Sequence, residues 1–349
     1  MWVTSSFATA LTPTAVALGN FDGVHLGHRQ VIQPILPNTG ASDASAPCKP
    51  LVEDCQIKQK NSSLPILKDN LGNSLAQDRG HIYPTVATFN PHPREFFSGI
   101  SWKLLTPRPE KVQQLSLLGV EQLVLLPFDR ELASLSPQQF VEKILVQQLS
   151  VKQVSVGEDF RFGYQRAGTS ADLKAIASSY GIAVTIVSLE TCQGERISSS
   201  VIRQALEQGD IIQANQRLGR SYSLTGVVVK GQQLGRTIGF PTANLELPPE
   251  KFLPRQGVYG VRVDALSLSS PISSQPGVMN IGMRPTISGT ALSVEIHLLD
   301  WSGDLYGQTL TVSLEQFLRP EQKFASLDHL KAQIQADCAV ARSFFDNKT

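Results

Sequence analysis

The sequence is poor in cysteine, and its four cysteines form no Cys-x-x-Cys pair. They stand at Cys48, Cys55, Cys192 and Cys338. Cysteines so few and so widely spaced do not form the disulfide framework that holds small secreted domains together. We therefore expect reduced thiols and a cytoplasmic protein.

The sequence also lacks an excess of either charge, with 31 basic and 30 acidic residues and a formal net charge of +1. Without a broad basic surface, it is not expected to bind nucleic acid, so any phosphate binding must come from local geometry. No run of about 18 apolar residues is present, and no Lys or Arg precedes Arg29. We expect neither a membrane span nor a signal peptide, while a homo-oligomer is compatible with the sequence.

What is present is enough chain for two domains, with 349 residues and 41% hydrophobic content. In the first half, short apolar runs alternate with helix-like stretches, a pattern that predicts a parallel sheet covered by helices on both faces. The expected strands are 15–18, 85–89, 122–126, 153–156 and 183–188. The expected helices are 26–36, 109–118, 137–148 and 170–180.

Residues 37–80 interrupt this alternation, because they are rich in Ser, Asn, Pro, Asp and Lys and have no sustained period. We expect a flexible surface insertion there. Two further helices are expected at 198–206 and 211–218. We place the first domain at 1–205, a linker at 206–220 and the second domain at 221–349.

The second half contains apolar runs separated by Gly, Pro and Ser turns, and no helical period lies between them. The runs at 222–229, 258–263, 277–281, 292–299 and 309–317 predict a small antiparallel barrel. A closing helix from Ser326 is expected to pack one apolar face on it.

The densest signal is Gly19-Asn-Phe-Asp-Gly-Val-His-Leu-Gly-His28, where an apolar run ends in a turn and delivers His25 and His28 to the start of a helix. A helix N-terminus attracts phosphate, and side chains three residues apart share one helical face. Small Gly27 leaves room for a nucleotide, so the segment suits a site that binds and cleaves a triphosphate.

Three other segments follow predicted strands and are expected at the same edge of the sheet. They are Thr88-Phe-Asn-Pro-His-Pro93, Gly157-Glu-Asp-Phe-Arg-Phe-Gly163 and Arg196-Ile-Ser-Ser-Ser200. Arg196 and the serines could bind phosphate oxygens. Taken alone, the histidine pair could be half a metal site or only polar surface, Pro-His-Pro could be a rigid turn, and the serines could be only a helix N-cap.

Together, the histidine turn, the Pro-His-Pro loop, Asp159-Phe-Arg-Phe-Gly163 and Ile197-Ser-Ser-Ser-Val-Ile-Arg203 resemble the adenylyltransferase module of prokaryotic bifunctional riboflavin kinase/FAD synthetases. The resemblance implies a Rossmann-like nucleotidylyltransferase domain in which the FMN phosphate attacks the α-phosphorus of ATP and pyrophosphate leaves. His25 and His28 would stabilise charge on the phosphates, and Arg196, Ser199 and Ser200 would hold the pyrophosphate.

By the same resemblance, Gly19, Phe21, Asp22 and Asp159 belong to the binding site for ATP and phosphate. Two positions depart from the family pattern. Ser200 stands where Thr is common, which keeps the hydroxyl. Asp159 stands where many relatives have Asn, and a carboxylate there would repel a phosphate unless it has another role.

The second dense signal is Gly226-Val-Val-Val-Lys-Gly-Gln-Gln-Leu-Gly-Arg-Thr-Ile-Gly-Phe-Pro-Thr-Ala-Asn244. Its glycines, Gly231, Gly235 and Gly239, allow the backbone to approach a ligand closely. A Walker loop is excluded because the spacing is one residue short, Arg236 replaces Lys, and no strand-to-helix context is present.

Thr242 and Asn244 share one side of an extended chain and present oxygen atoms suited to Mg²⁺, although a polar turn is an equal alternative. In Val294-Glu-Ile-His-Leu298, Glu295 alternates with apolar residues and could accept a proton at the mouth of a barrel. A carboxylate exposed to solvent is the ordinary alternative.

These segments resemble riboflavin kinase, together with motifs that occur in the order typical of that family. The motifs are Gly257-Val-Tyr-Gly260, Gly277-Val-Met-Asn-Ile-Gly282, Arg284-Pro-Thr286, Leu305-Tyr-Gly307 and Leu318-Arg319. The resemblance implies that Thr242 and Asn244 bind Mg²⁺ and ATP phosphate, that Glu295 is the base, and that Arg319 lies near the flavin. The glycine loop with Arg236 would complete the site for ATP and flavin.

The expected protein is thus a bifunctional enzyme that makes FMN from riboflavin and FAD from FMN, with ATP and Mg²⁺ in both steps. Three alternatives are a kinase with an impaired adenylyltransferase site, a flavin-binding regulator without turnover, and an adenylyltransferase for nicotinamide or pantetheine nucleotides. The intact site residues argue against the first two, and the kinase half argues against the third.

Overall fold

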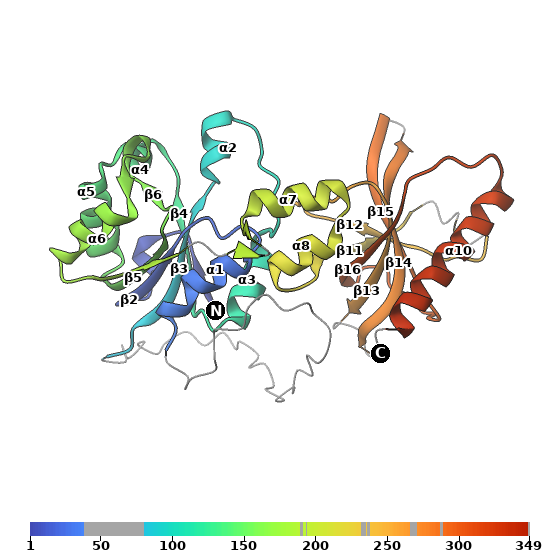
Figure 1. The fold of residues 1–349 in the computed structure, drawn as a ribbon, viewed down its shortest axis with the longest axis horizontal. Helices are drawn as coiled ribbons and strands as arrows, with labels where there is room; N and C mark the ends of the chain where they lie inside the picture. Colours follow the sequence, from blue (N-terminus) through green and yellow to red (C-terminus); the bar gives the residue numbers. More distant parts are fainter. Residues whose placement is uncertain are drawn as a thin grey trace.

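The computed structural model describes residues 1–37, 80–188, 191–192, 194–231, 235, 238–265, 271–286 and 289–347. Figure 1 shows two bodies, a sheet domain and a barrel, with helices α7 (Ser199–Gln208) and α8 (Ile211–Leu218) between them. Apart from its two end residues, the expected insertion at 37–80 lies outside the described residues. Within them, no helix is both long enough and apolar enough to cross a bilayer.

The first domain is built on a six-stranded parallel sheet in the order β1-β4-β3-β2-β5-β8. Its strands are β1 (Trp2–Thr4), β2 (Thr14–Leu18), β3 (Tyr83–Asn90), β4 (Gln122–Pro127), β5 (Val151–Gly157) and β8 (Ala183–Val187). The expected parallel sheet is confirmed. The edge strand β1 is an addition, because three residues are too few to show a period.

Helices cover both faces of the sheet, as predicted. Along β2, Ala15 and Ala17 pack with α1 (Leu26–Ile32) and α3 (Arg108–Leu117), while Val16 and Leu18 pack on the opposite face. The helices on that opposite face are α5 (Pro137–Phe140), its π-helical continuation (Val141–Gln148) and α6 (Ser170–Ser178). Every side chain of β2 is therefore buried.

Several elements differ from the prediction in detail. The helix expected over 26–36 changes to a 3₁₀ turn at Gln33–Ile35, where Pro34 removes a backbone donor. Two short helices were not predicted, α2 (Pro93–Ser98) and α4 (Arg130–Ser134). Two-residue strands also form two small hairpins, β6 (Arg161–Phe162) with β7 (Gly168–Thr169) and β9 (Thr191–Cys192) with β10 (Glu195–Arg196).

The second domain is a closed antiparallel barrel in the order β11-β12-β15-β14-β13-β16, which confirms the expected class. Its strands are β11 (Tyr222–Val229), β12 (Ala243–Glu246), β13 (Gly257–Ala265), β14 (Ile272–Thr286), β15 (Gly289–Leu298) and β16 (Thr309–Pro320). The C-terminal helix α10 (Leu327–Asp346) packs Cys338, Ala341 and Phe345 on the outside of β13 and β14. Figure 1 shows α10 on the side away from the sheet domain.

The two domains meet at a seam, which we define as residues 103–110 of the sheet domain and 248–252 of the barrel domain. Leu104 donates its N–H to the carbonyl of Glu250 at 2.6 Å and accepts from the N–H of Phe252 at 2.8 Å. Apolar residues of α7 and α8 join the barrel core beside this seam. The domains are thus connected by backbone hydrogen bonds as well as by apolar packing.

Candidate functional site

The histidine turn follows β2 and is held in a strained backbone conformation. Phe21 and Val24 have φ of 46° and 42°, values that residues other than glycine rarely adopt. The turn is fixed from outside, because Gly23 N–H donates to Thr106 Oγ1 at 3.0 Å and Arg220 donates to the carbonyl of Gly23 at 2.7 Å. Strain of this kind persists only where the surroundings stabilise it, and it is common at functional sites.

The two histidines lie together at the start of α1. His25 is the N-cap, and its Nδ1 accepts from the backbone N–H of His28 at 3.3 Å. The two rings stack with centroids 3.6 Å apart. Nδ1 of His28 is buried and has no hydrogen-bond partner among the described residues. The structure thus brings both predicted histidines into one place at the start of α1.

Both imidazoles are neutral near pH 7. Burial, with help from Arg220 and Arg196, lowers the pKa of His25 from 6.5 to about 4. Burial, the His25 ring and Lys111 hold the pKa of His28 well below 6.5. Permanent positive charge therefore comes from the cations around the histidines, and each neutral ring supplies one N–H donor.

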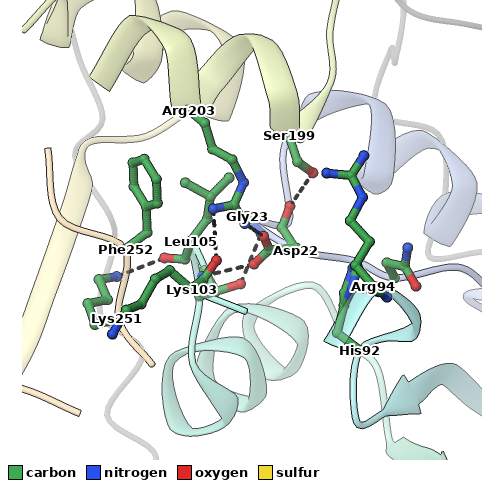
Figure 2. A network of polar contacts seen from close by, with 12 residues as sticks. Asp22, Gly23, His92, Arg94, Lys103, Leu105, Ser199, Arg203, Lys251 and Phe252 are labelled. Atoms are coloured by element: carbon green, nitrogen blue, oxygen red, sulfur yellow. Dashed lines mark hydrogen bonds and ion pairs between the residues drawn. The ribbon is translucent and has the colours of Figure 1, made fainter. Parts of the chain in front are cut away.

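Asp22 is buried behind the turn, where its carboxylate pairs with Arg203 and accepts from the N–H of Thr106 at 3.2 Å. Ser199 donates its hydroxyl to the carbonyl of Asp22 at 2.8 Å (Figure 2). These contacts connect the histidine turn to α7. In this conformation, the contacts of the Asp22 carboxylate stabilise the histidine turn.

The serines at the start of α7 have different environments. Ser198 caps α7 by accepting from the N–H of Val201 at 3.4 Å, so the N-cap interpretation applies to this serine. Ser200 is exposed in the first turn of the same helix. The helix N-terminus therefore presents Ser200 to solvent, beside Ser199 and the histidine turn.

Asp159 has a partner that the sequence did not indicate. Its carboxylate forms an ion pair with Arg196, and both side chains are about half exposed. Arg196 also lies close enough to His25 to lower its pKa. Asp159 is therefore paired with the guanidinium of Arg196, which is predicted to hold phosphate.

The Pro-His-Pro loop completes the edge of the sheet. His92 caps α2, where its Nδ1 accepts from Arg94 N–H at 3.1 Å, and it stacks on Trp102. A cavity of about 120 Å³ lies beneath this loop. Its polar lining consists of Asn20, Thr88, Asn90, His92, Glu95, Arg108 and Lys111.

Lys111 and Arg220 are site residues that sequence reasoning missed. Lys111 lies on a predicted helix whose sequence contains no motif that indicates a function. Arg220 falls in the predicted linker. Their neighbours come from distant segments, since Lys111 contacts Asn20 and Arg220 contacts Gly23 and Val24. Nothing in the local sequence of either residue indicates those partners.

A second constellation lies on the barrel. Asn244, Glu295 and Asn280 are direct partners on β12, β15 and β14, so they form a row on one face. The hydroxyl of Thr242 lies 3.5 Å from Glu295 Oε2. Residues alternating with this row, such as Ile296, point into the core. Glu295 therefore points away from the core, and its expected position at the barrel's mouth stays a prediction.

The glycine loop packs tightly against this row. A Cβ on Gly231 would lie 2.3 Å from Asn244 Nδ2, and one on Gly235 would lie 2.3 Å from the Phe240 carbonyl. Only glycine fits at both positions. Gly239 has φ of +90°, which also favours glycine, and Arg236 lies outside the described residues.

Arg319 lies at the other side of the barrel wall and is engaged by α10. Its Nε and Nη2 donate to Asp337 at 2.9 and 2.8 Å, and its guanidinium lies over Phe324. An open cavity of about 450 Å³ is lined by residues 322–325 and the start of α10. The predicted flavin contact of Arg319 stays a prediction, while its role in anchoring α10 is evident.

Comparison with known proteins connects the two constellations to two family models. The model described as "FAD synthetase" matches residues 8–46 and 73–201, and the model described as "Riboflavin kinase" matches residues 218–345. The first match skips 47–72, which lies within the expected insertion. Each constellation falls within one match, with two exceptions. Arg203 lies just beyond the end of the first match, and Arg220, which contacts the histidine turn, lies at the start of the second.

Curated relatives cover nearly the whole chain. The "Bifunctional riboflavin kinase/FMN adenylyltransferase" of Escherichia coli (strain K12) is 38% identical over 331 residues, covering 95% of this chain and 92% of that protein. The protein of the same name from Bacillus subtilis (strain 168) is 32% identical over 343 residues, covering 96% and 93%.

A solved structure shares the two-domain arrangement. The "Macrolide-efflux Protein from Streptococcus pneumoniae" matches with a TM-score of 0.75 and 28% identity, covering 97% of this chain and 98% of that chain. Its title names an activity that neither family model describes. The relatives that are more similar in sequence therefore carry more weight for function.

Proposed function

Because the chain belongs to the family of bifunctional riboflavin kinases/FMN adenylyltransferases, we propose that it makes FMN and then FAD at two separate sites, one in each domain. The observation that carries the proposal is the coincidence of each family match with one constellation of polar residues. The barrel would phosphorylate riboflavin, and the sheet domain would adenylylate FMN.

In the kinase step, Glu295 would accept the proton of the terminal ribityl hydroxyl. The hydroxyl oxygen would then attack the γ-phosphorus of ATP, and ADP would leave. Thr242 and Asn244 offer oxygen atoms beside the Glu295 carboxylate, which is the donor set that Mg²⁺ prefers. When bound, Mg²⁺ would neutralise charge on the phosphates of ATP. The close approach of Gly231 to the Asn244 side chain supports a role for this glycine in positioning Asn244.

In the adenylyl step, a phosphate oxygen of FMN would attack the α-phosphorus of ATP, and pyrophosphate would leave. His25 and His28 would each donate an N–H to phosphate oxygens, and Arg196, Ser199 and Ser200 would hold the pyrophosphate. Gly19 and Phe21 would shape the turn. For Asp22, the pairing with Arg203 supports a positioning role rather than direct contact with ATP.

An aromatic cluster near the cavity offers a surface for the flavin ring. Phe89 lines the cavity and packs edge-on against Phe128 at 5.3 Å, and Phe96 and Phe97 contact the same ring. Phe97 is 73% exposed. An exposed aromatic surface of this kind suits the stacking of a planar ligand, which supports flavin binding in the sheet domain.

The test is a chromatographic time course of purified protein with riboflavin, ATP and Mg²⁺. We expect FMN to appear first and FAD second. Glu295→Gln should stop FMN formation and spare FAD formation from supplied FMN, and His28→Ala should do the reverse. Glu246→Gln and His81→Ala are matched controls at exposed positions and should change neither rate.

Other outcomes would select the alternatives. FMN without FAD would indicate an impaired adenylyltransferase site, and bound flavin without product would indicate a regulator. Loss of both activities in either single variant would contradict two separate sites. The homo-oligomer and the cytoplasmic location stay predictions.

A further inference from the structure

Lys111 is a buried cation that the proposed reaction does not yet use. Its side chain lies on α3 and is only 8% exposed. Nζ donates to the carbonyl of Asn20 at 3.0 Å, which is its one hydrogen bond within the described part of the chain. Two of its three ammonium hydrogens therefore have no protein acceptor there. A buried ammonium without its full set of partners is costly, and a ligand can supply what is missing.

Within the described part of the chain, one carboxylate acts on the charge of Lys111. Asp22 is the carboxylate that raises the pKa of Lys111, against the lowering caused by burial. That carboxylate is already paired with Arg203 (Figure 2). One anion thus faces two cations, and an additional anion would complete the balance.

The position of Lys111 connects the two motifs of the sheet domain. Its charge lowers the pKa of His28 in the histidine turn and of His92 in the Pro-His-Pro loop. Its side chain lines the cavity of about 120 Å³ beneath that loop, together with Asn20, Thr88 and Asn90. The cavity therefore offers donors and two cations, Lys111 and Arg108, against one carboxylate, Glu95, next to the place where ATP phosphates are proposed to bind.

The aromatic side chains next to the cavity favour an anion that carries a planar ring. Phe89 lines the cavity and joins the aromatic cluster of Phe96, Phe97 and Phe128. FMN has a phosphate at one end and a planar flavin ring at the other. The phosphate would fit the cavity, and the ring would lie along the aromatic cluster. The ATP phosphates have a separate set of residues in Arg196, Ser199 and the histidine turn.

We propose that Lys111 is a catalytic residue of the adenylyl transfer, which holds the attacking phosphate of FMN in this cavity. The inference rests on the proposed adenylyltransferase site. An FMN phosphate oxygen forms a bond to the α-phosphorus of ATP, while the bond from that phosphorus to the bridging oxygen of pyrophosphate breaks. Lys111 transfers no proton. It orients the nucleophile and reduces the repulsion between two anionic phosphates.

The test uses Lys111→Met, which keeps the length of the side chain and removes its charge. Initial rates of FAD formation are measured with FMN varied and then with ATP varied, and FMN formation is measured in the same preparation. We expect kcat/KM for FMN to fall at least 50-fold, while KM for ATP and the kinase rate change less than twofold. Lys174→Met, at an exposed position on α6 that does not line the cavity, should match the wild type.

A second readout uses inorganic phosphate as a probe. It should inhibit FAD formation competitively with FMN in the wild type, and this competition should disappear in Lys111→Met. If Lys111→Met does not fold, Lys111→Arg keeps the charge and should retain competition by phosphate. An unchanged kcat/KM for FMN, or a defect confined to KM for ATP, would overturn the proposal. Full activity of His28→Ala would instead contradict the proposed site itself.

Discussion

The ammonium of Lys251 in the barrel domain lies 2.5 Å from the carboxylate of Glu110 in the sheet domain, and both side chains are almost completely buried. Lys251 also donates to the carbonyl of Leu105 at 2.8 Å, and its ammonium lies 4.5 Å from the centre of the Tyr222 ring. Burial lowers the pKa of Lys251 and raises that of Glu110. Removal of one partner would leave an uncompensated charge in the seam.

Lys251→Met should therefore destabilise the protein, by about 3–5 kcal/mol, and should impair FAD formation more than FMN formation. The neighbouring Thr106 holds Asp22 and Gly23 in the histidine turn, so a displaced seam changes the adenylyltransferase site. Urea unfolding and the two initial rates measure these effects. Lys103→Met, which removes an exposed contact to the same seam, is the control. An equal loss of both activities would contradict the coupling.

Asp159→Asn should strengthen ATP binding in the adenylyl step, because it releases Arg196 from its ion pair. Both side chains are about half exposed, so solvent screening limits the effect to about 1 kcal/mol or less, or a fewfold lower KM. The measurement is KM for ATP at saturating FMN. Glu158→Gln, the exposed neighbour, should have no effect, and an increased KM would show that the carboxylate assists binding.

Stability should fall as the pH drops from about 6.5 towards 4, partly because of His25. Its pKa is lowered from 6.5 to about 4, so the unfolded chain binds the proton first over this range. The difference corresponds to on the order of 3 kcal/mol. His25→Asn keeps an N-cap residue and removes the titration. Urea unfolding at pH 7 and pH 5 should show a smaller loss in this variant, and equal losses would contradict the assignment.

Gly231→Ala should lower kcat/KM of the kinase reaction at least tenfold, because its Cβ would displace the Asn244 side chain. FAD formation from supplied FMN should not change. Gly239→Asn adds a side chain to the same loop where nothing lies within 4 Å, and Asn tolerates a positive φ. Its effect should be smaller. Equal effects of the two variants would indicate general loop sensitivity rather than the contact with Asn244.

Local pattern predicted most of the fold. The buried run at 15–18 and the alternation in 294–298 are visible without any partner, because strand periodicity is a property of adjacent residues. The sequence pattern predicts no strand at β12 (Ala243–Glu246). It indicates only extended chain in which Asn244 is a candidate ligand. The structure also brings His25 and His28 together and places Thr242 and Asn244 beside Glu295, while the roles of these residues stay predictions.

The roles of charged side chains in the sites could not be predicted in the same way. Arg203 pairs with Asp22 across 181 residues, and Lys251 pairs with Glu110 across 141. Arg196 in β10 and Asp159 in the turn after β5 likewise come from different segments. Such pairs depend on the packing of distant elements, and a single sequence contains no periodic signal for them.

The backbone pairing of Leu104 with residues 250–252 also limits how the chain can be recombined. A hybrid that joins the sheet domain of one relative to the barrel of another would create a mismatched seam unless residues 103–110 and 248–252 are exchanged as a set. For the same reason, division of the gene into two reading frames would expose Glu110 on the sheet domain and Lys251 on the barrel, both of which are buried in the intact chain. The seam therefore favours inheritance of the two activities on a single polypeptide.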